Sequence, residues 1–243
     1  MKGKCKLCLK DSVLNNSHII PEYFYKPMYD PKHRFLKISP EPTEKNKYVQ
    51  KGLREYLLCN DCEQHINEYE KYANSAMFYE QPKSISQNHK IAVIGGIDYK
   101  LMKLFQLSIL WRASVSSLET FSEIKLGLHQ ERLRKMVLNN IPGKYADYGC
   151  LQTAIFIERN KLATDLLMPV DLVRIKKYTT YRFVFGGMMW LYFVTNHNNK
   201  FKHKDMFLQE NGTLTITKYP IENIKYLFDY WEDLYNQGKL EAK

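Results

Sequence analysis

Cysteine spacing is the clearest chemical signal in this 243-residue sequence, because four of its five cysteines fall into two C-x-x-C pairs. The pairs are Cys5 with Cys8 and Cys59 with Cys62, and 50 residues separate them. Two such pairs supply the four thiolates of a tetrahedral zinc site, which stabilises modules too small to fold on apolar burial alone. The first residues carry no recognisable secretory signal, so we predict a structural zinc ion rather than disulfides.

Cys150 and His65 also carry groups that bind metals, but neither is needed for this site. Cys150 precedes an apolar, strand-like stretch and is expected to be a buried, unreactive thiol. His65 follows Cys62 by three positions and could compete as a ligand, although four cysteines already complete the coordination. We therefore expect His65 on the surface of a helix.

His18 lies between the two cysteine pairs, in the stretch NNSHIIPEYF at residues 15–24. An imidazole titrates near neutral pH, which suits it to general-base catalysis. A histidine at the end of a short strand can equally be an ordinary structural residue. The motifs around His18 favour the general base over the structural residue, which stays as the alternative.

The order of these motifs resembles that of HNH endonucleases of the zinc-containing ββα-metal (treble-clef) type. The resemblance covers about residues 5–70 and consists of C-x-x-C, a short apolar approach to H-I-I-P, and L-L-C-x-x-C opening a helix. It implies a phosphodiester hydrolase in which His18 activates a water molecule as general base. It also implies a divalent ion that stabilises the developing charge and the leaving oxygen.

Three positions depart from the family's pattern. Ser17 stands where an acidic metal ligand is usual, and a hydroxyl is a poor ligand. Arg54 lies near the family's middle asparagine and could hold the scissile phosphate bidentately. Glu63 stands where an asparagine or histidine binds the catalytic metal, and its carboxylate suits Mg²⁺ or Mn²⁺. We therefore expect His18, Glu63 and Arg54 to form the catalytic site.

Each of these assignments has a structural alternative. Glu63 could only balance the dipole of a helix N-terminus, and Arg54 could be an ordinary surface arginine. Glu70 lies two helical turns after Glu63, about 10 Å away, and is expected to have a supporting or structural role. His33, in the segment DPKHRF, is expected to be a solvated loop residue.

Composition favours a polyanionic partner, because the formal net charge is +10 and the pI is about 9.2. Nucleic acid fits this charge, with DNA favoured over RNA. The longest apolar run, residues 183–194, is too short to span a membrane and contains Gly186-Gly187, which predicts two strands joined by a tight turn. We therefore expect a soluble, cytoplasmic protein with no membrane contact.

The fold class predicted from these patterns is α+β. We expect a zinc-binding nuclease module at 1–80, a linker at 81–90, and a domain at 91–243 with helices and a short, largely antiparallel sheet. Asp98 is expected to cap a helix with one apolar face, carrying Leu101 to Leu118. Residues 29–51 are expected to form an exposed loop or irregular ribbon. Further helices are expected from near 61, at 129–138 and at 221–235, and strands at 151–158, 179–185, 188–195 and 213–218.

The part after the linker carries no motif with recognisable chemistry, such as a P-loop or a nucleophile elbow. Its stretches LSILWRASVSS and LHQERLRKMV resemble the body of bacterial HNH-type proteins, some of which are found among phage-defence genes. It could grip nucleic acid, regulate the nuclease or form a homodimer. It could also hold a toxin-like or defence effector inactive until a regulatory protein partner or a phage signal arrives. Seven basic residues could contact phosphates, unless they only form solvated faces: Arg112, Arg132, Arg134, Lys135, Arg174, Lys176 and Lys177. The aromatic strand YTTYRFVF could stack on bases, but such tyrosines more often belong to a core.

Two functions remain open from these patterns. The first is a metal-dependent endonuclease with structural Zn²⁺ and catalytic Mg²⁺ or Mn²⁺. The alternative is a zinc-stabilised nucleic-acid-binding protein whose catalytic site has decayed, for which Ser17 and Arg54 argue.

Overall fold

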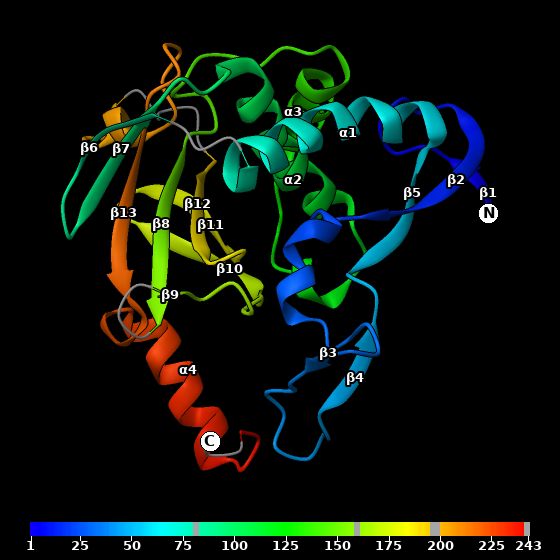
Figure 1. Cartoon of the computed structure of the whole chain (residues 1–243). Helices are drawn as coiled ribbons and strands as arrows, with labels where there is room; N and C mark the ends of the chain where they lie inside the picture. The colour runs from blue at the N-terminus through cyan, green and yellow to red at the C-terminus, as the bar shows by residue number, and fades with distance from the viewer. Residues whose placement is uncertain (80–82, 158–160, 195–199, 241–243) are drawn as a thin grey trace.

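The computed structural model is a mixed α+β fold, which confirms the predicted fold class at this level (Figure 1). It describes residues 1–79, 83–157, 161–194 and 200–240. Its α-helices are α1 (Asn60–Asn74), α2 (Tyr99–Val115), α3 (Leu128–Leu138) and α4 (Lys225–Asn236). The start of α1 lies one residue before the predicted position, and α4 begins four residues late because a 3-10 turn, Ile221–Asn223, precedes it.

The N-terminal part contains a three-stranded antiparallel sheet in the order β1–β2–β5. These strands are β1 (Lys2–Lys4), β2 (Asp11–His18) and β5 (Arg54–Cys59). The register places Leu14 opposite Cys59 and His18 opposite Arg54. Since α1 begins directly after β5, the second cysteine pair lies where the strand meets the helix.

The polar segment at 29–51 forms a hairpin of β3 (Arg34–Lys37) and β4 (Lys47–Gln50). The expected irregular ribbon is therefore a regular antiparallel pair. Aromatic contacts pack this hairpin against the segment that precedes it. The Phe35 ring lies 5.8 Å from that of Tyr25 and 6.4 Å from that of Tyr29. Tyr25 follows a 3-10 turn, Glu22–Phe24, and precedes another, Lys26–Met28.

The second sheet has the strand order β10–β11–β12–β8–β13–β7–β6, with β9 attached to β8. All pairs are antiparallel except β8 with β13, which is parallel. The sheet is therefore larger than the short one predicted, because β6, β7, β9 and β10 were not expected. The strands are β6 (Lys83–Gln87), β7 (Ile91–Gly95), β8 (Cys150–Ile157), β9 (Lys161–Leu162), β10 (Met168–Ile175), β11 (Tyr178–Phe185), β12 (Met188–Phe193) and β13 (Leu214–Pro220).

Three details of this sheet bear on the predictions. The Gly-Gly turn is confirmed, because Phe185 pairs with Met188 and both glycines have positive φ. The linker prediction for 81–90 is wrong over most of its length, because β6 occupies residues 83–87 and pairs with β7. Glu158 and Thr195, the last residues of two predicted strands, lie outside the described residues, as do residues 81 and 82.

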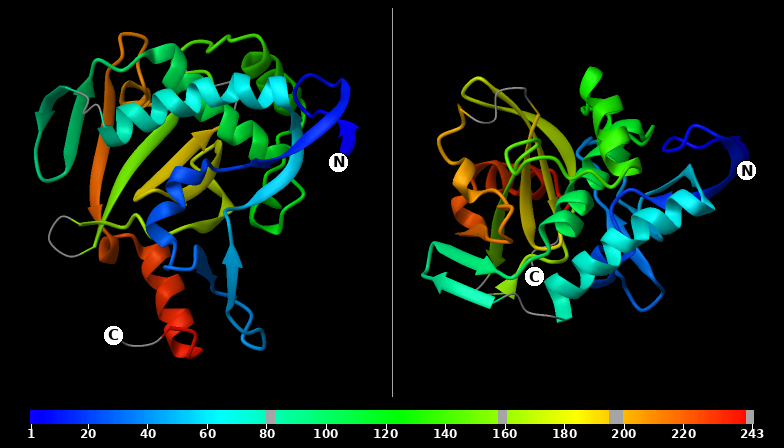
Figure 2. Two further views of the ribbon diagram at one scale, coloured as in Figure 1. Left: turned by 45° about the vertical axis from the view of Figure 1, so that its right-hand side comes forward. Right: turned by 90° about the horizontal axis from the view of Figure 1, so that it is seen from above.

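Helix α2 is buried all round rather than along one face. Every residue from Met102 to Ala113 is buried, because α2 packs against α1 and α3 and also faces the large sheet (Figure 2). The Phe105 ring, for example, lies 6.4 Å from that of Trp190 in β12. The predicted cap is confirmed, since Asp98 Oδ1 accepts a 2.9 Å hydrogen bond from the Leu101 amide. The helix ends at Val115, so Leu118 lies outside it.

One continuous hydrophobic core joins the two parts of the chain. It includes Leu7 and Ile19 from the N-terminal part together with Trp111 of α2 and Trp190 of the sheet. Phe24 forms part of the junction, because its ring lies 4.8 Å from that of Phe185. Among the described residues, no helix has the length and apolarity needed to cross a membrane.

Substitution of Gly186 by alanine is expected to loosen this junction. A Cβ at Gly186 would lie 2.3 Å from the Phe24 ring, and the residue has a φ of 62°. Displacing the ring costs about 1–3 kcal/mol beyond the strain of positive φ. Gly96→Ala is the matched control, because its φ is 80° but no atom lies within 4 Å. Urea unfolding should show a larger loss for Gly186→Ala, and equal losses would contradict this packing argument.

Candidate functional site

The four cysteines of the two C-x-x-C pairs come together in space. Their Sγ atoms all lie within 4.8 Å of one another, and Cys8 Sγ is 3.8 Å from Cys59 Sγ. Zn–S bonds of about 2.3 Å in a tetrahedron place neighbouring sulfurs about 3.8 Å apart. A disulfide would require about 2.05 Å. The four thiols can therefore hold a metal ion such as zinc.

The backbone around these thiols supports metal binding. The Cys59 amide donates a 3.3 Å hydrogen bond to Cys5 Sγ. Burial raises the pKa of the Cys5 thiol, but N–H groups of Cys59, Cys8 and Leu7 outweigh it and lower this pKa to about 7. Burial raises the pKa of both Cys59 and Cys62. Binding of a metal ion by four thiolates is therefore expected to release protons.

Helix α3 braces the first cysteine pair and corrects two predictions. Arg134 donates from Nη1 to the Leu7 carbonyl at 2.5 Å and forms a 2.7 Å ion pair with Glu131, so it is not a free phosphate contact. His65, which belongs to α1, is half-buried against α3 rather than exposed on the helix surface. Its Nε2 lies 2.8 Å from the Val137 carbonyl oxygen.

His18 contacts Arg54, which lies opposite it across the strand pair. Arg54 Nε donates a 2.8 Å hydrogen bond to His18 Nε2. Burial lowers the pKa of His18 to about 4, and the positive charges of Arg54 and Arg112 act in the same direction against Glu22. His18 is therefore a neutral imidazole at physiological pH.

Arg112 lies in the protein interior, so the prediction that it contacts phosphate is wrong. It is 1% exposed, and its Nη1 donates a 2.8 Å hydrogen bond to the His18 carbonyl oxygen. The same nitrogen lies 2.6 Å from Glu70 Oε1. Burial raises the pKa of Glu70, while the Arg112 charge opposes that shift. This buried ion pair holds the backbone of His18 and gives Glu70 the supporting role expected of it.

A signal for this ion pair was present in the sequence. Arg112 interrupts an apolar stretch, SILWRASV, and an arginine among residues of this kind must have a buried partner. The sequence did not indicate which acid that partner would be. The same reasoning applies to Lys103, which is buried and donates a 3.1 Å hydrogen bond from Nζ to the Tyr148 carbonyl.

Glu63, near the N-terminus of α1, is bonded to the residue that precedes His18. The Ser17 hydroxyl donates a 2.5 Å hydrogen bond to Glu63 Oε2. A carboxylate can accept about four hydrogen bonds or metal contacts, so this bond leaves Glu63 able to bind an ion. Within the described part of the chain, the four-cysteine group is the one cluster of three or more metal-binding side chains. Glu63 could still suffice, because Mg²⁺ often uses one or two carboxylates plus waters and substrate phosphates.

The predicted catalytic residues take part in two separate contacts, Ser17 with Glu63 and His18 with Arg54. Successive strand residues point to opposite faces, so the Ser17–Glu63 contact and the His18–Arg54 contact lie on different sides of β2. His18 is the last residue of β2, and Arg54 is the first of β5. The Ser17–Glu63 and His18–Arg54 contacts therefore both lie at the end of the strand pair where β2 ends and β5 begins.

The remaining candidates lie elsewhere. His33 is exposed in the turn before β3, as expected, with its ring 6.0 Å from that of Tyr29. Tyr178 and Tyr181 are 4% and 2% exposed, so these tyrosines belong to the core. Cys150 is buried, and burial raises its pKa, which agrees with an unreactive thiol. Five basic residues are exposed, and their contact with phosphates remains a prediction: Arg132, Lys135, Arg174, Lys176 and Lys177.

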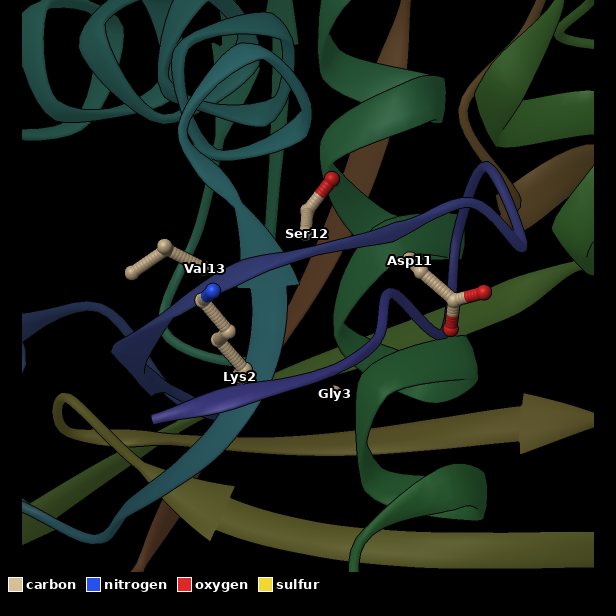
Figure 3. Close-up of a pocket in the computed structure, with 5 residues that line it drawn as sticks. All are labelled: Lys2, Gly3, Asp11, Ser12 and Val13. Atoms are coloured by element: carbon tan, nitrogen blue, oxygen red, sulfur yellow. The ribbon is translucent and has the colours of Figure 1, made fainter.

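A shallow hollow on β1 and β2 contains none of the predicted catalytic residues. It is lined by Lys2, Gly3, Asp11, Ser12 and Val13 (Figure 3).

No protein-family model, curated protein or solved structure matches this chain. The four-cysteine group and the surroundings of His18 are therefore the features from which a function can be inferred.

Proposed function

We propose that this protein is a metal-dependent HNH-type endonuclease that hydrolyses phosphodiester bonds in nucleic acid, preferentially DNA. The position of His18 carries the proposal. His18 ends β2, and the paired strand β5 leads through the second cysteine pair into α1, which carries Glu63. This strand–strand–helix order around a four-cysteine site supports assignment to the zinc-containing ββα-metal (treble-clef) type.

The proposed roles follow from the chemistry of each side chain. His18 accepts a proton from the attacking water, since it is neutral at physiological pH. Arg54 binds the scissile phosphate through its guanidinium. Glu63 would hold Mg²⁺ or Mn²⁺, and that ion would supply stabilisation of the charge that develops on the phosphate. Arg112 and Glu70 hold the His18 backbone from the core.

Replacement of His18 by alanine is expected to reduce cleavage about 10²–10⁴-fold, because a general base contributes this much. The assay compares plasmid DNA and RNA with added Mg²⁺, Mn²⁺ or EDTA, after one zinc per chain has been verified. His33→Ala is the matched control, because His33 is an exposed histidine in a turn. The absence of cleavage by folded, zinc-loaded wild type would contradict the nuclease proposal.

The pH profile of cleavage is expected to lack an acid limb in the usual histidine range. A base acts only when unprotonated, and the pKa of His18 is lowered to about 4. Therefore kcat/KM should stay level from pH 8 down to about 5 and fall only near pH 4. The unfolded chain takes up this proton near pH 6.5, so stability falls between pH 6.5 and 4 and circular dichroism must accompany the assay. An acid limb near pH 6.5 would exclude His18 in this environment as the base.

The alternative function is a zinc-stabilised nucleic-acid-binding protein without catalysis. Two observations favour it: Arg54 occupies His18 Nε2, and the Ser17–Glu63 contact lies on the other side of β2. It predicts binding that weakens steeply with salt and does not depend on Mg²⁺ or Mn²⁺. A binding titration on protein that fails to cleave would therefore identify this function.

A further inference from the structure

The hydrogen bond between Arg54 and His18 has a consequence for catalysis. A neutral imidazole has one nitrogen that donates and one that accepts. An arginine Nε–H can only donate, so Nε2 of His18 is the accepting nitrogen and Nδ1 carries the proton. In this state, the one lone pair that could take a proton from water is already occupied.

Arg54 is held by contacts that a phosphate can replace. Its second described partner is Glu22, whose carboxylate lies 3.5 Å from Nη2 and whose side chain is 51% exposed. The Arg54 side chain is itself 23% exposed. A guanidinium binds a phosphate through two charge-assisted hydrogen bonds, which are stronger than one bond to a neutral imidazole. A phosphodiester that reaches Arg54 is therefore expected to draw it away from His18.

The position of His18 does not depend on Arg54 alone. Its carbonyl oxygen accepts a 2.8 Å hydrogen bond from Arg112, which is buried and paired with Glu70. Ile19 and Ile20, the next residues along the chain, are buried in the core. The backbone of His18 is therefore held in place when the Arg54 side chain moves.

We propose that Arg54 masks His18 in the resting protein, and that a substrate phosphate unmasks it by taking over the guanidinium. This inference rests on the proposed nuclease function and adds regulation of its base. Arg54 then has two consecutive roles, because it blocks His18 without substrate and binds the phosphate once substrate arrives. The base is thus available only when a phosphodiester lies beside it.

Labelling with diethyl pyrocarbonate tests the mask, because this reagent acylates an unprotonated imidazole nitrogen. Mass spectrometry would give the labelling rate of His18 relative to exposed His33 in the same sample. Arg54→Met removes the donor and should raise this ratio roughly tenfold, the value of a hydrogen bond that involves a charged group. Glu22→Gln is the matched control, because it removes the other partner of Arg54 and should leave the ratio unchanged.

A second arm uses wild-type protein with dimethyl phosphate as a phosphodiester probe, against sodium chloride at equal ionic strength. The ratio should rise with dimethyl phosphate only. An unchanged ratio in Arg54→Met overturns the mask, and an unchanged ratio with dimethyl phosphate overturns its release by phosphate. If Arg54→Met does not fold, a ¹H–¹⁵N spectrum of wild type shows which ring nitrogen of His18 carries the proton. A proton on Nε2 would overturn the mask, because that nitrogen could not then accept from Arg54. Labelling reports on the imidazole whether or not nucleic acid is cleaved, so lack of cleavage would overturn only the proposed function.

Discussion

Replacement of Cys62 by serine is expected to abolish the zinc binding predicted for the four-cysteine group and to unfold the N-terminal part of the protein. Cys62 is buried and is one of the four thiols within 4.8 Å of one another. Structural zinc contributes about 10–16 kcal/mol to the folding of zinc-finger peptides, and a serine hydroxyl is a poor substitute for a thiolate. Because Cys5 and Leu7 belong to the main core, the loss should also lower the stability of the rest of the chain.

The measurements are zinc content per chain and the midpoint of urea unfolding. Cys150→Ser is the matched control, because it makes the same change at a buried thiol that does not belong to the four-cysteine group. It should retain one zinc and lose about 1–3 kcal/mol, the cost of burying a hydroxyl. A Cys62→Ser variant with one tightly bound zinc and the stability of this control would contradict the structural role of the metal.

Replacement of Arg112 by methionine is expected to destabilise the protein by about 3–5 kcal/mol, because it leaves a buried acid without its partner. The Arg112 side chain is 1% exposed and that of Glu70 is 19% exposed, so water cannot readily take the place of the arginine. The substitution also removes the hydrogen bond to the His18 carbonyl. Loss of the proposed cleavage activity should therefore accompany loss of stability, even though Arg112 is buried.

A double-mutant cycle with Glu70→Met separates the ion pair from the rest of the effect. Replacing both partners of a buried ion pair by apolar residues is often close to neutral, so the double variant should be more stable than Arg112→Met alone. Arg132→Met is the surface control and should change stability by less than about 0.5 kcal/mol, because Arg132 is exposed. If Arg112→Met were no more destabilising than Arg132→Met, the ion pair would have no role in stability.

Features that depend on neighbouring residues were predictable from the sequence. The C-x-x-C spacing indicated the four-cysteine group, Asp98 indicated the start of α2, and Gly186-Gly187 indicated the turn between β11 and β12. The helix cap and the turn depend on backbone geometry within a few residues, and the spacing within each cysteine pair indicated metal chemistry although the two pairs are 50 residues apart. The four predicted strands correspond to β8, β11, β12 and β13, with described ends that differ by one or two residues at most, because apolar runs bounded by turn residues favour strands.

Strand β6 and the burial of α2 were not predictable in this way. The sequence of β6, KSISQ, is mostly polar and all five of its residues are exposed, so its pairing with β7 leaves no apolar pattern. The pattern of α2 predicted one buried face, but packing against α1, α3 and the large sheet buries it all round. Both features depend on elements that are distant along the chain.

The sequence by itself determined the types of side chain available for chemistry: four thiols, a histidine between them, and an acid at the start of α1. Only the tertiary structure decided what these side chains contact. In the folded chain, Arg54 donates a hydrogen bond to His18 Nε2, and Ser17 donates one to Glu63. Arg112 forms an ion pair with Glu70 and donates a hydrogen bond to the His18 carbonyl. The physical reason is that the pKa and position of a charged group depend on burial and on partners brought close by folding. Arg112, for example, lies 94 residues after the histidine whose carbonyl it holds, a distance that no local pattern can bridge.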